Sequence, residues 1–199
     1  MANDTRPVGL IPITQPYGNM RVNYYIANTA VNIFIGQLVA LNNSGQVQIV
    51  PVGANQPAIG VAVGFLDTTL SGPPSGVTVL TQGGYLPSST DAYVAVTNDP
   101  QQMYLIEEDT GSTALTTAAI GAAGDFIYIA QTGSTVTGLS NTVLDRSTVA
   151  ADTAGLLQLL QVQNIINQDG TVNVPGDYCK WVVRIANHQL NGTKLSLAV

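Results

Sequence analysis

The feature that most constrains this chain is a series of short apolar runs separated by clusters of glycine, proline and asparagine. The run 46–50 alternates polar and apolar residues, and the run 59–65 is rich in small and β-branched residues. Alternation with period two places successive side chains on opposite faces of a β-strand. Many short strands with turn signals between them are typical of all-β folds. We therefore expect an all-β protein, a sandwich or barrel of short antiparallel strands.

The expected strands follow from these runs. Residues 33–41 and 46–50 flank the turn cluster Asn42-Asn43-Ser44-Gly45, which predicts a β-hairpin. In the segment 147–162, Ser147 is suited to cap a helix, but 158–162 also fits a strand and Gly155 interrupts the helical pattern. We favour a strand there and keep the helix as the alternative. Further strands are expected at 59–65, 77–80, 92–96, 103–106, 126–130 and 177–185.

The N-terminal region differs from the rest of the chain. Pro7, Pro12, Pro16 and Gly18 interrupt each short apolar stretch, and proline fixes φ and removes an amide donor. We expect residues 1–30 to form an extended N-terminal arm, with a flexible tail as the alternative. Residues 31–199 are then the β-rich body, which could divide into modules near 31–90 and 91–199. Removing residues 2–25 is expected to leave the β-core folded.

The expected arm carries side chains of the types that are enriched at protein interfaces, arginine and tyrosine. An arm that orders on a neighbouring protein would use them as contacts. The predicted contact residues are Arg6, Tyr17, Arg21, Tyr24 and Tyr25.

Charge excludes several classes of partner. Charged residues make up 9% of the chain, the net charge is −6, and no lysine or arginine lies between Arg21 and Arg146. No basic stripe can therefore bind a nucleic-acid backbone or an anionic membrane. The 45% hydrophobic content argues against disorder, and the longest apolar run, 58–66, is too short to span a bilayer. Ser, Thr, Asn and Gln, about three residues in ten, supply an uncharged polar surface instead.

The chain has one cysteine and one histidine, too few for an intrachain disulfide or a cysteine–histidine metal site. Cys179 alternates in register with Trp181 and Ile185, which indicates a buried small side chain rather than a nucleophile paired with His188. His188 follows the last predicted strand. We expect its side chain to be packed or hydrogen-bonded, with a pH sensor as the alternative.

The sequence Asp109-Thr110-Gly111-Ser112 matches the loop of dimeric aspartic proteases, which share a proton between two carboxylates. Glu107 and Glu108 precede it directly, so like charges would gather there, and a turn that closes the preceding strand is the preferred interpretation. The three carboxylates lack the alternating ligand spacing of a calcium loop, and a solvated acidic turn is expected. We expect no enzyme activity, no cofactor and no bound metal.

Several segments resemble small head-decoration (cement) proteins of tailed bacteriophages. In the first half these are Ile35-Gly36-Gln37-Leu38-Val39, Ser44-Gly45-Gln46-Val47 and Ile59-Gly60-Val61-Ala62. The second half is similar to a group of phage virion proteins of comparable length. Its matching pieces are 92–94 with 99–100, 133–140 followed by 144–145, and 183–188.

The resemblance implies a non-enzymatic protein on the outer surface of an icosahedral head. It would bind there commonly as a homotrimer and stabilise contacts between subunits of the major capsid protein. The competing interpretation is a phage fibre, spike or host-binding adhesin, which uses the same Thr/Asn/Gln/Gly-rich β chemistry. A fibre shaft usually shows short repeats, and none is found in the sequence, which favours the cement protein.

Overall fold

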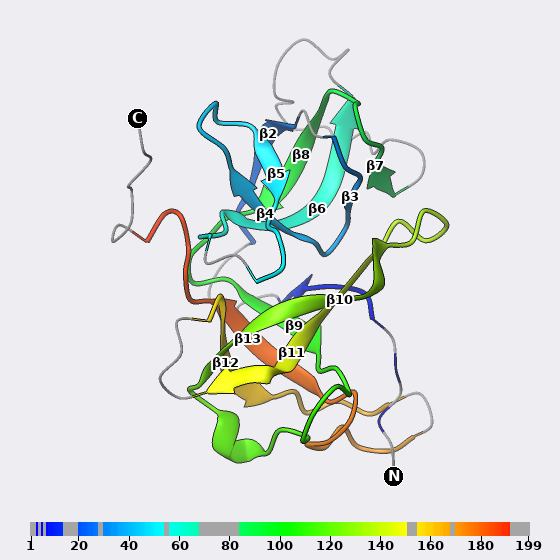
Figure 1. Cartoon of the computed structure of the whole chain (residues 1–199), viewed down its shortest axis with the longest axis vertical. Helices are drawn as coiled ribbons and strands as arrows, with labels where there is room; N and C mark the ends of the chain where they lie inside the picture. Colours follow the sequence, from blue (N-terminus) through cyan, green and yellow to red (C-terminus); the bar gives the residue numbers. More distant parts are fainter. Residues whose placement is uncertain are drawn as a thin grey trace.

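The computed structural model describes residues 3, 5, 7–13, 20–27, 30–53, 56–67, 84–150, 155–167 and 170–191. Within these residues the secondary structure consists of β-strands and one 3-10 turn, η1 (Thr117–Ala119), which confirms the expected all-β class. The strands form two groups stacked along the long axis of the molecule (Figure 1). The predicted strand 77–80 lies outside the described residues.

The first group is a closed five-stranded barrel in the order β2-β5-β4-β6-β8. The predicted hairpin is confirmed, with Val39 opposite Ile49, and the Asn42 side chain accepts the amides of Ser44 and Gln46 in its turn. The barrel strands are β2 (Val22–Ala27), β4 (Leu38–Leu41), β5 (Val47–Ile49), β6 (Gly60–Asp67) and β8 (Ala92–Thr97). Beside the barrel, β3 (Ile33–Phe34) pairs with β7 (Tyr85–Leu86).

The second group is a six-stranded sheet in the order β1-β9-β13-β12-β10-β11. A parallel bridge between Glu108 and Leu144 joins the end of β9 to β11. The sheet therefore curves until these two strands, which are not neighbours in its order, lie next to each other. Within the described parts of 147–162, residues 147–150 belong to β11 and 157–162 to β12, which confirms the favoured interpretation. The strands are β1 (Ile11–Pro12), β9 (Met103–Glu107), β10 (Ala123–Gly133), β11 (Ser140–Ala150), β12 (Leu157–Val162) and β13 (Lys180–Ile185).

The N-terminal region is part of the folded body where the structure describes it. Strand β1 pairs with β9, and β2 pairs along its whole length with β8. The expectation of an arm over 1–30 is therefore wrong for residues 22–27, because the prolines all precede this segment and its alternating side chains can pack inside the barrel. The barrel strands lie between residues 22 and 97. The two groups of strands therefore do not coincide with the expected modules near 31–90 and 91–199.

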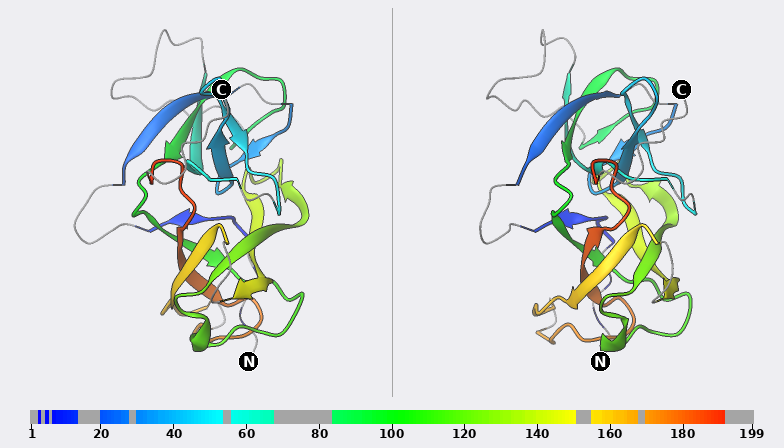
Figure 2. Two further views of the ribbon diagram at one scale, coloured as in Figure 1. Left: turned by 60° about the vertical axis from the view of Figure 1, so that its left-hand side comes forward. Right: turned by 90° about the vertical axis from the view of Figure 1, so that its left-hand side faces the viewer.

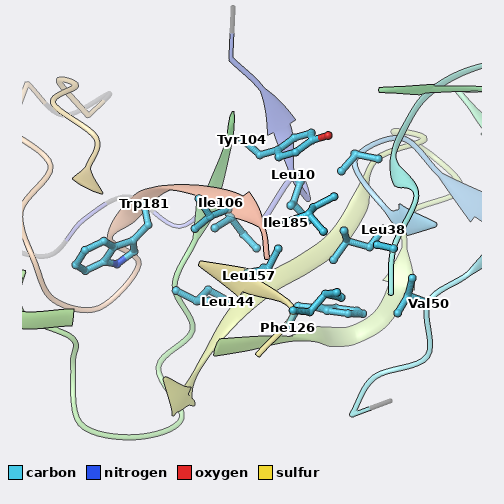
Figure 3. Packing of buried hydrophobic residues seen from close by; sticks show 14 of the residues in the cluster. Leu10, Leu38, Val50, Tyr104, Ile106, Phe126, Leu144, Leu157, Trp181 and Ile185 are labelled. Atoms are coloured by element: carbon cyan, nitrogen blue, oxygen red, sulfur yellow. The ribbon is translucent and has the colours of Figure 1, made fainter. Parts of the chain in front are cut away.

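One of the two buried hydrophobic clusters of the described residues runs from the barrel into the sheet, and the other lies in the barrel region alone. Leu38, Val50 and Val61 of the barrel region belong to the same buried cluster as Phe126 and Leu157 of the sheet. Figure 3 shows Leu38 and Val50 facing Phe126 across the junction. Strand β1 is the strand of the sheet that lies next to the barrel (Figure 2), and the preceding Leu10 donates its amide to the carbonyl of Gly36, 2.8 Å away, on the barrel side.

Candidate contact surface

The acidic run after β9 is buried, so the predicted solvated turn is wrong. Glu107, Glu108 and Asp109 are 4%, 0% and 6% exposed. The cause is backbone pairing: the Glu108 amide donates to the carbonyl of Cys179, and the Asp109 amide donates to that of Leu144. These bonds continue the ladder beyond β9 and draw the carboxylates into the seam between β13 and β11.

Donors from the same chain surround the Glu108 carboxylate. One oxygen accepts the indole N–H of Trp181 at 2.6 Å, and the other accepts the Leu115 amide at 3.0 Å and Arg146 Nη1 at 3.3 Å. Burial raises the pKa of Glu108, while these hydrogen bonds act to lower it. Arg146 also forms an ion pair with Asp177, with 2.7 Å between Nη1 and Oδ1. These contacts hold β11 and β13 to the residues that follow β9, and they close the seam of the six-stranded sheet.

Asp109 is engaged in the same way. Its Oδ1 accepts the Arg146 amide at 3.2 Å, and its Oδ2 accepts the Gly111 amide at 3.1 Å. A shared-proton pair in a dimeric protease needs a carboxylate that meets its counterpart from a second chain. Both oxygens of Asp109 instead hold backbone amides of their own chain, in keeping with the preferred interpretation of a turn.

Cys179 and His188 lie beyond opposite ends of β13, whose six residues span about 20 Å. Cys179 is fully buried, and burial raises the pKa of its thiol to about 12, which keeps it protonated at neutral pH. The His188 side chain is buried, its Nδ1 accepts the Leu190 amide at 3.1 Å, and burial lowers its pKa. The two side chains do not form a nucleophile–base pair.

Two kinds of feature are absent from the part of the chain that the structure describes. In the described part of the chain, no group of three or more His, Cys, Asp or Glu side chains is placed to hold a metal ion. Among the same residues, no helix has the length and apolar character needed to cross a membrane.

The structure describes three of the five predicted contact residues. Arg6 and Tyr17 lie outside the described residues. Arg21 is exposed just before β2, and Tyr24 and Tyr25 alternate on that strand. Tyr25 packs against the barrel core, and its hydroxyl accepts the side-chain amide of Asn98 at 2.6 Å. Tyr24 therefore lies on the outer face with Arg21 nearby, and the role of these residues in contacts stays a prediction.

A surface that the sequence analysis missed is a small hairpin, whose described residues are 163–167 and 170–174. Ile166 bridges Val172 in antiparallel pairing. The side chains of Asn167 and Asn173 point into the protein and are 7% and 4% exposed. The Asn173 side chain donates to the carbonyl of Lys180 and accepts its amide, which fastens the hairpin to the start of β13.

The outward face of the 163–174 hairpin is apolar. Ile166, Val172 and Val174 are 73%, 55% and 45% exposed, so the usual placement of apolar side chains is reversed. Asn3 holds this orientation, because its side-chain amide donates to the carbonyls of Val174 and Asp177. The alternating sequence 172–174 signals a strand, but alternation does not say which face is buried. We call Ile166, Val172 and Val174 the outward row.

No protein-family model matches this chain, and neither a curated protein nor a solved structure shows significant similarity to it.

Proposed function

We propose that this chain is a structural virion protein that decorates the outside of a phage head and stabilises contacts between major capsid subunits. The observation that carries the proposal is the outward row. Neighbouring exposed apolar side chains mark protein contact sites, whereas single ones are ordinary on any surface. The row carries no charge, which suits it to another uncharged protein surface.

The distribution of charge supports the same proposal. The chain has few charged residues, and three of its acidic side chains, Glu107 to Asp109, are removed from the surface by burial. Contacts made by shape and by neutral hydrogen bonds depend less on salt than exposed ion pairs do. Such a surface is suited to many weak contacts on a shell. The trimer implied by the resemblance is a separate prediction, which the mass in solution tests.

Deleting residues 2–25 is not a suitable test of head binding. This deletion removes β1 and most of β2, so we now expect it to disrupt the barrel rather than leave the core folded. Point substitutions on the outward row leave the strands and their hydrogen bonds in place and test the same question.

The test is binding to purified heads that lack this protein. The triple variant Ile166→Ser, Val172→Ser, Val174→Ser should lose at least about tenfold in affinity, because three apolar side chains no longer contribute to burial. The matched control is Val136→Ser, which changes a side chain that is 92% exposed at the tip of the β10–β11 hairpin.

Two outcomes contradict the proposal in different ways. If the triple variant fills the heads as the control does, the outward row is not the contact surface. If labelling of virions and electron microscopy place the protein on the tail, head decoration is wrong and the fibre or adhesin interpretation gains support.

A further inference from the structure

The segment that follows β13 fastens the sheet to the barrel, and we call its residues 186–191 the clasp. Ala58, just before β6, donates its amide to the carbonyl of Asn187 at 3.0 Å, and its own carbonyl accepts the Gln189 amide at 2.8 Å. This exchange forms the parallel bridge between Ala58 and His188. The Gln189 side chain adds two hydrogen bonds to the backbone of β4.

His188 holds the middle of the clasp in a conformation that requires a neutral imidazole. Its side chain is buried, and its Nδ1 accepts the amide of Leu190 at 3.1 Å. A ring nitrogen that accepts a hydrogen bond carries no proton, so the proton of the neutral ring lies on Nε2. Nε2 is buried and has no partner in hydrogen-bond geometry within the described chain. A second proton would turn Nδ1 into a donor that faces the Leu190 amide.

The charged group that acts on His188 comes from the turn between β8 and β9. Burial lowers the pKa of His188, whereas Asp99 and the backbone of Ile59 act to raise it. Asp99 also acts on Tyr104 of β9, which stays protonated because burial raises its pKa. Residues 56–60 carry no titratable side chain, and the clasp carries none besides this histidine. Loss of hydration therefore dominates and favours the neutral ring.

We propose that the clasp is acid-sensitive, so that protonation of His188 releases residues 186–191 from the barrel. In the open clasp the exposed ring takes up a proton near pH 6.5, the ordinary value for histidine, whereas the closed clasp takes it up only at lower pH. Above this value the ring is neutral in both forms. Below it, acid favours the open form by up to about tenfold for each pH unit, until the closed form is protonated as well.

Opening of the clasp is a local change at the junction. Leu38, Phe126 and Leu157 belong to the buried cluster that joins the barrel to the sheet, and this cluster contains no titrating group in the acid range. The two groups of strands therefore stay together when the clasp opens. This inference goes beyond head decoration and concerns the isolated chain, so a failure to bind heads leaves it unaffected.

The first measurement is the titration of His188 in the full chain by NMR. The chain has one histidine, so the imidazole C–H signals belong to this residue. We expect the midpoint of the titration below pH 6.5. Asp99→Asn keeps an oxygen that can accept the Gln101 amide but removes the charge that favours protonation, so it should move the midpoint further down.

Hydrogen exchange at about pH 7.5 and about pH 5 measures the opening itself. The amides of Ala58, Gln189 and Leu190 should lose about tenfold in protection at the lower pH, relative to the exchange of free peptides at each pH. The control is the amide of Ser140, which donates to the carbonyl of Ile35 at 2.8 Å on the opposite side of the molecule (Figure 1). Its protection should change less than that of the clasp.

His188→Asn is the matched variant. Its side-chain oxygen can replace Nδ1 as the acceptor of the Leu190 amide, but it does not titrate. The variant should keep the clasp protected at both pH values.

The inference is overturned if the His188 midpoint in the wild-type chain lies at pH 6.5 or above, or if the clasp amides of the wild-type chain keep their protection in acid. It is equally overturned if the Ser140 amide loses as much protection as the clasp, or if His188→Asn loses protection in acid as the wild type does.

Discussion

At the scale of single residues, Arg146 holds the seam of the six-stranded sheet. Its side chain is 4% exposed and lies within ion-pair distance of Glu108, Asp109 and Asp177. A buried guanidinium loses its hydration, and this cost is offset only when carboxylates surround it. Of these partners, Glu108 is fully buried whereas the Asp177 side chain is 57% exposed, so their contributions should differ.

Replacement of one carboxylate at a time measures this difference. Glu108→Gln should lower the free energy of unfolding by about 3 kcal/mol, because it leaves a buried arginine with weaker partners. Asp177→Asn removes a partner of the same arginine at the surface and should cost less than about 1 kcal/mol. Urea unfolding followed by circular dichroism checks both values. Equal losses in the two variants would show that burial does not govern this network.

At the scale of elements, the β10–β11 hairpin connects the six-stranded sheet to the β3–β7 pair beside the barrel. Leu139 near its tip bridges Ile35, and Gly138 packs against Gly84 at the start of β7. Gly138 has φ of +74°, and a Cβ there would lie 2.5 Å from the backbone carbon of Gly84. Glycine is required at this position by both the backbone conformation and the close approach.

Gly138→Ala and Gly45→Ala separate these two requirements. Gly45 has a similar φ of +73°, but a Cβ there meets nothing within 4 Å. Gly45→Ala should therefore cost only the conformational strain, about 1 kcal/mol, whereas Gly138→Ala adds the clash and should cost about 3 kcal/mol. Thermal unfolding of both variants gives the comparison. Similar losses would mean that the hairpin tip can move away from β7 at little cost.

At the scale of the whole molecule, the barrel and the sheet are joined through buried contacts. The Tyr104 hydroxyl of β9 donates to the carbonyl of Thr97 on β8 at 3.0 Å. The side chain of Gln189, beyond β13, exchanges two hydrogen bonds with the backbone of Leu41 on β4. Together with the shared core, these contacts indicate that the two groups of strands unfold as one unit.

Trp181 makes this cooperativity measurable, because the only tryptophan of the chain lies in the sheet. Leu38→Ala, a change in the barrel, should lower the stability by about 2–5 kcal/mol through the cavity it creates. The Trp181 fluorescence transition should shift by the same amount as the circular dichroism transition. If Trp181 reports an unchanged midpoint, the barrel and the sheet unfold separately.

Local patterns account for the parts of the fold that were predicted correctly. The hairpin at 33–50, the strands near 60, 92, 103, 126 and 180, and the burial of Cys179 follow from alternation and turn residues within a few positions of one another. The errors concern partners distant in sequence. The carboxylates 107–109 were expected in water because Arg146 and Trp181, which hold Glu108, are 38 and 73 residues away.

The sequence by itself determined the strand content, the turns and the lack of a basic surface, because each depends on composition or on neighbouring residues. The tertiary structure decided which face of each strand is buried and which edges are paired. Val172 and Val174 point outward because Asn3 and Lys180 hold the opposite face of their hairpin, which carries the asparagine side chains, against the protein. Strand β2 joins the barrel because β8 pairs with it. Alternation defines two faces of a strand, but only packing against distant segments selects the buried one.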